Sequence, residues 1–364
     1  MTLPDLLRQT LDAGASDLHL TVGTPPQVRV DGHLRRLSGP DLTPDAVKSL
    51  VYSVLTDAQK RGFEEHWELD LAFGLTGVGR FRCNVFNQRG NVGAVFRLIP
   101  EKIRSLEELG LPPVLGQLAD RPRGLVLVTG PTGSGKSTTL AAMIDRINLS
   151  RPAHILTIED PIEYLHAHKK SLVNQRELHA DTRGFTPALR AALREDPDVV
   201  LVGEMRDLET MEAAMKLAET GHLTLATLHT NSAAQTVTRV IDAFPSHQQA
   251  QIRTQLSLVL EGIVCQALVP KATGQGRVAA LEILVATPAI RNLIREDKIH
   301  QIYSSMQTGQ ERLGMQTLNQ ALTRLIERRV ITRETAMATT SNRDELTTML
   351  TRAAAARTDA AVAR

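Results

Sequence analysis

One octet of residues has the composition and spacing of a phosphate-binding loop. The pattern GxxxxGK[ST] is met by Gly130-Pro131-Thr132-Gly133-Ser134-Gly135-Lys136-Ser137, which follows the apolar run 125–128. Thr138 comes next and is expected to bind the nucleotide as well, and a helix-compatible segment opens at Thr139. Glycines let successive backbone amides surround a chain of phosphates, and the following helix adds its positive N-terminus. We expect Lys136 to contact the β and γ phosphates and Ser137 to bind Mg²⁺. The octet therefore predicts a site for a nucleoside triphosphate.

Polar side chains accompany four short apolar runs that lack alternation and so predict strands of a mainly parallel sheet: Leu125–Thr129, His154–Ile158, Val199–Gly203 and Leu223–Leu228. Open sheets of this kind bind ligands at the carboxyl ends of their strands. Glu163 follows the second run, Glu204 and Arg206 follow the third, and His229 follows the fourth, which His222 opens. We expect these side chains to gather at the edge that holds the phosphate loop. A carboxylate there could orient the attacking water or support Mg²⁺.

Each of these side chains also has a simpler interpretation. A single acid after a strand often complements the dipole of the next helix, although three such strand ends beside one phosphate loop favour a site. A zinc site would need HExxH or CxxC spacing, which His222 and His229 lack. Hydrogen bonds from these histidines to the γ-phosphate or to the attacking water fit better.

Arginines form two further candidate groups. The segment GRFRCNVFNQ alternates basic and apolar residues, and Arg82 in it and Arg97 beyond it are expected to meet an anion or another chain. Arg190 and Arg194 are four residues apart on a predicted helix and would share one face. That face could reach a nucleotide in the same or a neighbouring subunit.

Composition limits the class of protein. The chain has 364 residues, 42% hydrophobic and 23% charged, with a net charge of +2, so nothing in it requires a nucleic-acid partner. Cys83 and Cys265 lie in apolar runs and are interpreted as core residues. No run approaches the ~20 apolar residues that span a bilayer, and the charged start excludes a signal peptide. We expect a cytoplasmic protein that meets the membrane only through partners.

Two domains are the expected organisation at this length. Residues 1–100 read as an α+β domain with an antiparallel sheet, in which Asp31-Gly32 predicts a hairpin turn. The proline-rich stretch 101–115 is predicted to be an interdomain linker. Residues 116–364 carry the α/β pattern, a β-hairpin around residue 275 and a helical C-terminal region.

Four segments in this order resemble those of the secretion/pilus ATPases of the P-loop NTPase superfamily. They are GPTGSGKS, ILTIEDPIEYLH, DPDVVLVGEMRDLET and TGHLTLATLHTNSA, which resemble the Walker A, Asp-box, Walker B and His-box elements. Two more, ASDLHLTVGTPPQVRVDGHLRRL and the segment that opens with AIRNLIRE, resemble the pilus retraction branch. The resemblance extends from Ala15 to about Arg329.

This resemblance implies a PAS-like N-terminal domain, a RecA-like ATPase domain, a homohexamer, and ATP and Mg²⁺ as cofactors. It implies a motor for type IV pilus retraction and twitching motility, docked at the inner face of the cytoplasmic membrane on an inner-membrane platform protein, with a paralogous retraction ATPase as a further partner. Glu163 would be the general base, Ser137 and Glu204 would support the metal, and His222 and His229 would sense the γ-phosphate. Arg82, Arg97, Arg190, Arg194 and Arg206 match arginines that reach the nucleotide, and Ala289–Glu296 would couple hydrolysis to retraction.

Other functions stay open at this point. An accessory retraction ATPase of the same superfamily is one, although AIRNLIRE argues against it. A pilus extension or type II secretion ATPase is another, although those enzymes carry a tetracysteine element and this chain has two cysteines. A nucleic-acid translocase would need a basic channel, and a non-hydrolysing scaffold would not need Lys136, Glu163 and Glu204 together.

Overall fold

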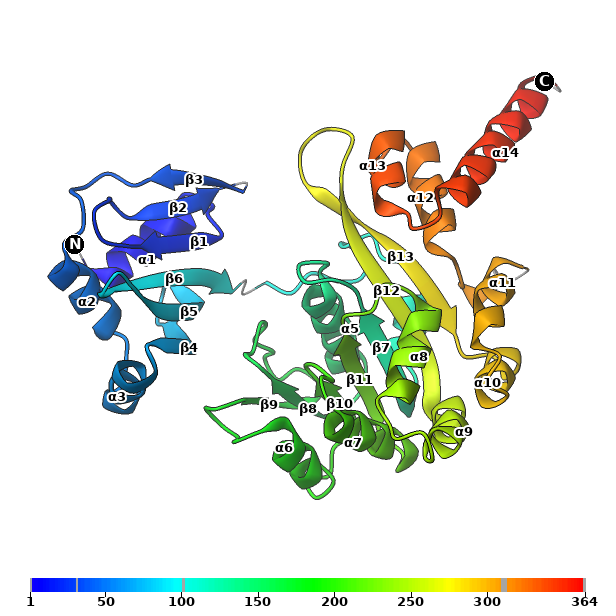
Figure 1. Ribbon diagram of the computed structural model, residues 1–364, viewed down its shortest axis with the longest axis horizontal. Coiled ribbons are helices and arrows are strands. Elements are labelled where there is room, and N and C mark those ends of the chain that lie inside the picture. The colour runs from blue at the N-terminus through cyan, green and yellow to red at the C-terminus, as the bar shows by residue number, and fades with distance from the viewer. Residues whose placement is uncertain (1, 31, 100–101, 309–312, 363–364) are drawn as a thin grey trace. The chain divides into compact units, whose positions relative to one another are not determined.

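The computed structural model describes residues 2–30, 32–99, 102–308 and 313–362, so Asp31 of the predicted hairpin turn lies outside the described part. The chain forms two compact units (Figure 1). The first consists of Met1–Lys102 together with Pro161–Leu165, and the second of Ile103–Asp160 and His166–Arg364. A short segment that follows a strand of the second unit therefore packs with the first.

The first unit is a six-stranded antiparallel sheet with three helices. Its elements are α1 (Leu3–Asp12), β1 (Asp17–Leu20), β2 (Gln27–Val30), β3 (His33–Arg36), α2 (Pro44–Tyr52), α3 (Asp57–His66), β4 (Glu68–Leu75), β5 (Gly79–Gln88) and β6 (Asn91–Ile99). The strand order is β3-β2-β1-β6-β5-β4. Threonines begin all three helices, because their hydroxyl oxygens accept the free backbone N–H groups of the first turn.

Alternation along β5 determines which side chains enter the core of the first unit. Phe81, Cys83 and Val85 are fully buried there, whereas Arg80 and Arg82 on the other face are only half-buried. The prediction that Cys83 is a core residue is confirmed. The other face of β5 thus keeps arginine side chains accessible, because strand residues point alternately to opposite faces.

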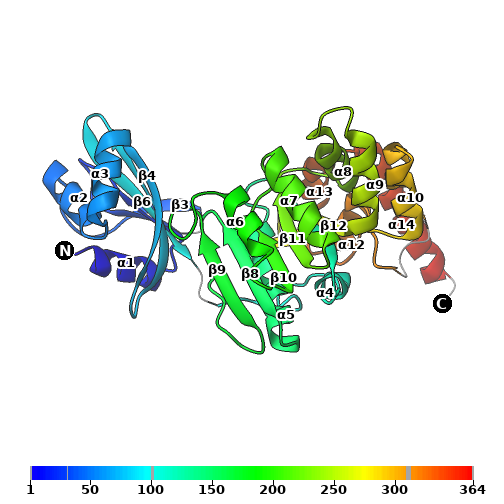
Figure 2. The ribbon, with the colours of Figure 1, turned by 90° about the horizontal axis from the view of Figure 1, so that it is seen from below.

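The second unit is built around a seven-stranded sheet (Figure 2). Its elements as far as the hairpin are α4 (Val114–Ala119), β7 (Gly124–Thr129), α5 (Lys136–Ser150), β8 (His154–Glu159), β9 (Leu172–Glu177), α6 (Phe185–Ala192), β10 (Val199–Val202), α7 (Leu208–Glu219), β11 (Leu223–Leu228), α8 (Ala233–Asp242), α9 (Gln249–Val259), β12 (Leu260–Pro270) and β13 (Arg277–Val285). The C-terminal region adds α10 (Pro288–Arg295), η1 (Ile299–Gln301), α11 (Ile302–Gln307), α12 (Leu318–Glu327), α13 (Arg333–Thr339) and α14 (Arg343–Val362).

Strand order in this sheet is β13-β12-β7-β11-β10-β8-β9, parallel except for the β12–β13 hairpin. The parallel sheet and the hairpin confirm the sequence prediction, but β9 was not among the predicted strands. Its residues alternate between buried and exposed, so it lacks the uniform apolar run of its neighbours. Both faces of the sheet are covered, because Leu125 and Leu127 of β7 join one core and Val126 and Val128 the other.

Residues of the predicted linker take part in the core of the second unit. Leu106 and Leu111 are buried among side chains of α4, α5 and the sheet, and Gly314 lies so close that an added Cβ would be 2.7 Å from Val114 Cβ. Among the described residues, no helix combines the length and apolar character needed to cross a bilayer.

Candidate functional site

The phosphate loop of the second unit has the predicted strand–loop–helix context. It connects β7 to α5, whose first residues are Lys136 and Ser137. Glycines are needed at two positions because neighbouring atoms approach closely. A Cβ at Gly130 would lie 2.2 Å from the Gln266 carbonyl oxygen, and one at Gly135 would lie 2.7 Å from Gln266 Nε2; both residues have positive φ.

Lys136 lies with its ammonium group in the mouth of the loop. Its Nζ donates to the carbonyl oxygens of Gly130 at 2.8 Å and Pro131 at 3.2 Å. Pro131 and Thr132 are exposed, whereas Ser134 is buried, so the loop presents one face to solvent. A cation and a ring of backbone amides at the start of a helix form a site for a chain of phosphates.

Strand register brings two of the predicted residues to this same edge. Val202 of β10 lies opposite Ala226 of β11, and Leu228 of β11 lies opposite Thr129, the last residue before the loop. Glu204 and His229 follow these strands, and His229 Nε2 lies 3.0 Å from Glu204 Oε1. The parallel sheet thus joins the loop, the acid and the histidine, as the sequence predicted.

Arg206 holds the other oxygen of the same carboxylate, with its Nε 2.8 Å from Glu204 Oε2. The Glu204 side chain is 21% exposed, and the contacts with Arg206 and His229 orient its two carboxylate oxygens. Each carboxylate oxygen keeps a second lone pair, so a water molecule or a metal-bound water can still donate to it.

His222 does not lie at this edge, contrary to the sequence expectation. Its carbonyl oxygen accepts from Gly124 N at 3.0 Å, at the amino end of β7, and its Nδ1 lies 2.9 Å from the Leu217 carbonyl oxygen. In a parallel sheet, residues that precede a strand lie at the opposite edge from those that follow it. The six residues of β11 therefore separate His222 from His229 by about 20 Å.

Arg190 and Arg194 are both exposed but do not share a helix face. Arg190 lies in the last turn of α6, which ends at Ala192, and Arg194 lies in the following turn, where its N donates to the Ala191 carbonyl oxygen at 2.8 Å. Asp196 and Pro197 end the helix before β10 begins. Arg194 thus precedes β10, at the amino end of the parallel strands. The phosphate loop lies at their carboxyl end.

Glu163, Arg82 and Arg97 line one small cavity of the first unit, about 140 Å³ in volume. Arg97 Nε donates to Asp17 Oδ1 at 2.8 Å, and Arg82 Nη2 lies 3.9 Å from Asp70 Oδ1. Burial raises the pKa of Asp17, but hydrogen bonds from Ser16 and Arg97 outweigh it and leave this pKa lower than usual. Asp17 is therefore ionised at neutral pH and orients Arg97, whose side chain remains 67% exposed.

Sequence reasoning did not identify Gln266, which contacts the phosphate loop from β12. Gln266 Nε2 donates to the Ser134 carbonyl oxygen at 2.6 Å, and Gln266 Oε1 accepts from Thr139 Oγ1 at 2.7 Å. The side chain is 5% exposed, so both amide ends are satisfied by the loop and by α5. No local signal marks this residue, because its contact depends on β12 pairing with β7 across more than 130 residues of chain.

The strand β13, which pairs with β12, carries a buried acid. Glu282 of β13 lies opposite Cys265 of β12, and its Oε1 accepts from Ala233 N at 2.7 Å. Its Oε2 accepts from Leu318 N at 3.5 Å. Burial raises the pKa of Glu282, and hydrogen bonds from the two backbone N–H groups partly oppose this shift. One carboxylate therefore connects the start of α8, just after the His229 loop, to the start of α12.

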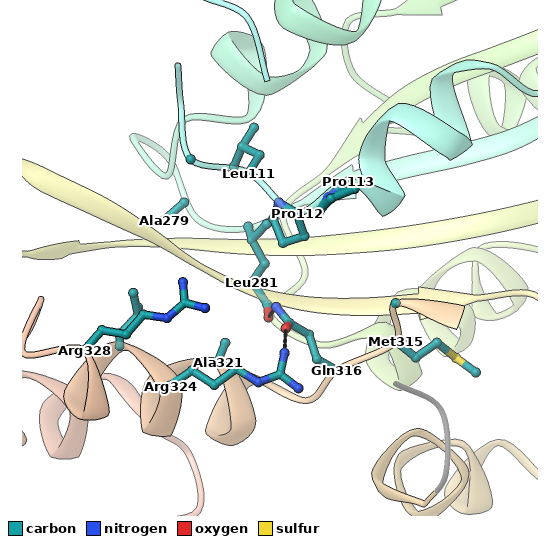
Figure 3. Close-up of a pocket in the computed structure, with 13 residues that line it drawn as sticks. Leu111, Pro112, Pro113, Ala279, Leu281, Met315, Gln316, Ala321, Arg324 and Arg328 are labelled. Carbon is teal, nitrogen blue, oxygen red and sulfur yellow. Dashed lines mark hydrogen bonds between the residues drawn. The ribbon is translucent and has the colours of Figure 1, made fainter. Parts of the chain in front are cut away.

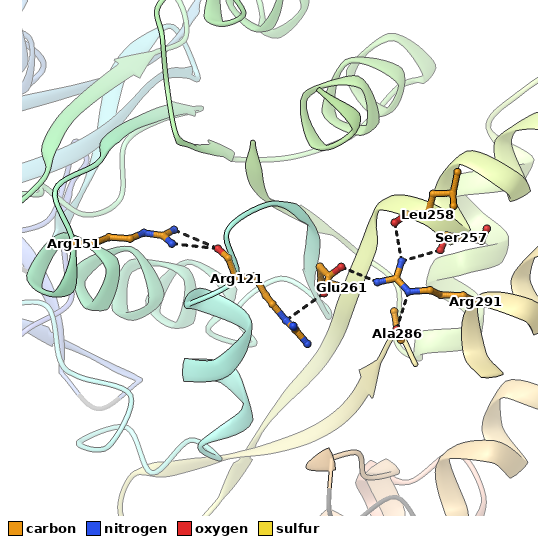
Figure 4. A network of polar contacts seen from close by, with 7 residues as sticks. All are labelled: Arg121, Arg151, Ser257, Leu258, Glu261, Ala286 and Arg291. Atoms are coloured by element: carbon orange, nitrogen blue, oxygen red, sulfur yellow. Dashed lines mark hydrogen bonds and ion pairs between the residues drawn. The ribbon is translucent and has the colours of Figure 1, made fainter. Parts of the chain in front are cut away.

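The two cysteines and the AIRNLIRE segment have structural roles. Burial raises the pKa of the Cys265 thiol to about 12, and its Sγ accepts from Thr129 Oγ1 at 3.0 Å, which confirms it as a core residue. In α10, Ile290 and Ile294 are buried, and Arg291 donates to the carbonyl oxygens of Ser257 and Leu258 and to Glu261 Oε1 (Figure 4). Only part of Ala289–Glu296, including Arg295 and Glu296, is exposed.

Magnesium can be tested against the oxygen atoms at the loop. Mg²⁺ prefers hard oxygen ligands and is usually held by one or two protein groups, substrate phosphates and waters. Ser137 at the first turn of α5 and the carboxylate of Glu204 are groups of this kind. Within the described residues there is no cluster of three or more His, Cys, Asp or Glu side chains suited to a metal. The oxygen atoms of Ser137 and Glu204 fit a Mg²⁺ ion that arrives with a nucleotide.

A phosphate loop, a strand-end acid and a strand-end histidine on one edge of a parallel sheet define a P-loop nucleotide-binding protein. The chain belongs to the Type II/IV secretion system protein family, which it matches over residues 2–356. It is 56% identical over 336 residues to the type IV pilus retraction ATPase PilT of Pseudomonas aeruginosa, covering 92% of this chain and 97% of PilT.

Two further comparisons bear on the branch of the family. The type IV pilus ATPase PilU of Pseudomonas aeruginosa is 44% identical over 350 residues, covering 96% of this chain and 91% of PilU. A crystal structure of the pilus retraction motor PilT with bound ADP has a TM-score of 0.89 and 52% identity, covering 95% of this chain and 98% of that chain. The retraction ATPase is thus more similar than PilU in sequence.

Proposed function

We propose that this chain is the ATP-hydrolysing motor that powers type IV pilus retraction and hence twitching motility. The observation that carries the proposal is 56% identity to PilT over nearly the full length of both chains, together with an intact phosphate loop. The crystal structure of PilT with ADP supports ATP as the nucleotide. Mg²⁺ would arrive with ATP and supply charge neutralisation of the phosphates, held by Ser137 and Glu204.

Each side chain at the phosphate edge has a role in this proposal. Lys136 binds the β and γ phosphates, and Glu204, oriented by Arg206 and His229, would support Mg²⁺ together with Ser137. His229 contacts the γ-phosphate, so its contact with Glu204 would differ between ATP and ADP. Ser137 and Thr138 open α5 beside the phosphates.

Glu163 is proposed as the general base that takes the proton of the attacking water. It lies four positions after Glu159, the last residue of β8, so its Cα cannot be more than about 14 Å from the Cα at the end of that strand. It is exposed and packs with the unit that carries Arg82 and Arg97. Because Glu163, Arg82 and Arg97 belong to one compact unit, they would move away from the nucleotide together when the γ-phosphate is lost.

The finer parts of the proposal concern assembly. We propose a homohexamer, in which the exposed Arg190 and Arg194 and the distant His222 act toward a neighbouring subunit. The motor would work in the cytoplasm at the inner face of the membrane, on an inner-membrane platform protein, with a paralogous ATPase as partner. The PAS-like character of the first unit and the boundaries 1–100, 101–115 and 116–364 also remain proposals.

A gene deletion tests the function directly. A strain without this gene should carry excess pili and show no twitching, and the gene for the intact chain should restore movement. An accessory ATPase of the PilU kind is the second candidate because of the 44% identity. In a strain that lacks both paralogues, this chain alone should restore retraction; failure there, with rescue only beside a second ATPase, would assign it to the accessory kind. Absent pili would indicate an extension ATPase.

A further inference from the structure

Thr227 of β11 is a buried residue that lies beside the phosphate loop and precedes the strand-end histidine. Its backbone pairs in register with Val128 of β7, and the phosphate loop begins two residues after Val128. Along its own strand, Thr227 precedes His229 by two residues. A change in the position of Thr227 would therefore affect both the loop and the histidine.

Both neighbours of Glu204 in the chain are hydrogen-bonded to Thr227. Thr227 Oγ1 donates to the Gly203 carbonyl oxygen at 2.5 Å, and the Thr227 carbonyl oxygen accepts from Met205 N at 3.0 Å. The strand β10 ends at Val202, so these two contacts continue the connection between β10 and β11 beyond the last paired residues. The backbone that carries Glu204 is thus held on each side of it by one residue of the neighbouring strand.

The other side of Gly203 is held by β8. Gly203 N donates to the Ile158 carbonyl oxygen at 2.8 Å, and a Cβ at Gly203 would lie 3.1 Å from both Glu159 Cα and this oxygen. Met205, on the other side of Glu204, is buried in one of the two cores of the second unit. The direction in which Glu204 leaves the backbone therefore depends on the peptide group of Gly203, which β8 and Thr227 hold from opposite sides.

A second threonine of β11 shows that the strand itself does not require a hydroxyl group at its buried positions. Thr224 is fully buried, and within the described residues its Oγ1 has no hydrogen-bond partner. A β-branched apolar residue such as valine is equally suited to the interior of a sheet. Thr227 differs from Thr224 because its hydroxyl has a defined acceptor, and this acceptor belongs to the residue just before Glu204.

We propose that Thr227 is a positioning residue, which fixes Glu204 relative to the phosphate loop so that Glu204 and Ser137 can support the same Mg²⁺ ion. The inference rests on the role proposed above for Glu204. Arg206 and His229 orient the carboxylate oxygens of Glu204 but are themselves partly exposed, whereas the hydroxyl of Thr227 acts on the backbone from a buried position. Precise placement matters because Mg²⁺ requires near-ideal octahedral geometry, with oxygen ligands at about 2.1 Å.

The test measures how strongly Mg²⁺ raises the affinity of the full-length protein for nucleotide. Fluorescent ADP is titrated with excess Mg²⁺ and with EDTA, and the ratio of the Kd in EDTA to the Kd in Mg²⁺ is the magnesium effect. Thr227→Val keeps the branched shape but lacks the hydroxyl, so we expect the magnesium effect to fall about fivefold while the Kd in EDTA stays within about twofold. Thr227→Ala should behave in the same way, and Thr227→Ser, which keeps the hydroxyl, should retain the wild-type magnesium effect. A wild-type magnesium effect in Thr227→Val or Thr227→Ala would overturn the proposal.

Two control variants separate positioning from a general loss of stability. Thr224→Val makes the same change in the same strand and should leave the magnesium effect unchanged. Gln316 is a buried residue at a pocket of about 500 Å³ that no residue of the phosphate loop lines, and its Nε2 donates to the Leu281 carbonyl oxygen at 2.9 Å (Figure 3). Gln316→Met should lower the urea concentration at the midpoint of unfolding without changing the magnesium effect. If either control reduced the magnesium effect as much as Thr227→Val does, the proposal would be refuted.

Glu204→Gln, measured in the same way, separates this inference from the role proposed for Glu204. We expect both Glu204→Gln and Thr227→Val to lower the magnesium effect, and this result supports the proposal. If Glu204→Gln lowers it and Thr227→Val does not, Glu204 keeps its role and the inference about Thr227 alone fails. If Glu204→Gln leaves the magnesium effect unchanged, Glu204 does not support the metal, and the inference fails together with that role.

Discussion

Gln266 on β12 holds the Ser134 carbonyl oxygen of the phosphate loop at 2.6 Å, while its other amide end accepts from Thr139 of α5 at 2.7 Å. Through these two contacts, a residue of a separate strand connects the phosphate loop to α5, the helix that follows it. The side chain is buried, so its hydrogen bonds are not replaced by water when it is removed.

Gln266→Met keeps the volume of the side chain but removes both hydrogen bonds. We expect nucleotide affinity to fall about tenfold, because a loop with an unsatisfied carbonyl oxygen samples more conformations. Fluorescent-nucleotide titration measures this, with Gln275→Met at the exposed hairpin turn as the control. Equal affinity of the two variants would show that the contact does not position the loop.

Glu163→Gln removes the proposed base and preserves the shape of the side chain. Nucleotide binding should stay nearly intact, while ATP turnover should fall by about 10²-fold or more because no group then takes the proton of the attacking water. Steady-state turnover and nucleotide titration on the same sample separate the two effects. Glu212→Gln on the exposed face of α7 is the matched control. Turnover close to that of the control would rule out Glu163 as the base.

Much of this site could be predicted because its signals are local. The octet gives the loop, and the apolar runs place Glu204 and His229 at the carboxyl edge of the sheet. The prediction for His222 is wrong because a residue that precedes a parallel strand lies at the amino edge of the sheet, and His222 precedes β11. The prediction that Arg194 lies on a helix is wrong because α6 ends at Ala192, ahead of Asp196-Pro197. The role of Gln266 could not be predicted from local sequence, because it depends on β12 lying beside β7 in the sheet, and strand order is a property of the whole fold.

Glu282 predicts a pH dependence of stability. Its pKa is raised in the folded protein, mainly by burial, so the folded state binds the proton more tightly than the unfolded chain does. The contribution of Glu282 to the free energy of unfolding is therefore greatest below its pKa in the unfolded chain. This contribution is lost as the pH rises through its pKa in the folded protein. Nearby Glu345, which accepts from Tyr303 OH at 2.6 Å, adds to the upward shift.

Glu282→Gln lacks this titration. On acidification from pH 8 toward pH 5, the free energy of unfolding of the wild type should rise relative to that of the variant. Urea unfolding at several pH values measures the difference, in a range where the protein stays soluble. A difference that is constant with pH, or that changes in the opposite direction, would contradict the assignment.

Arg291→Ala tests the structural role of the AIRNLIRE segment. The change removes the donor to the carbonyl oxygens of Ser257 and Leu258 and to Oε1 of Glu261, whereas Arg121 still contacts Oε2 of that carboxylate (Figure 4). We expect a loss of about 2 kcal/mol in the free energy of unfolding. Arg295→Ala, on the same helix but exposed, should change it by less than about 0.5 kcal/mol. Equal effects in chemical denaturation would argue against the network.

ATP hydrolysis at the phosphate loop, which follows the carboxyl end of β7, depends on Lys136. The decisive measurement is ATP turnover by the purified full-length protein with Mg²⁺, compared between wild type and Lys136→Ala. Without the ammonium group that lies in the loop mouth, turnover should fall by about 10²-fold or more, to near background. Turnover in Lys136→Ala equal to that of the wild type would contradict the account.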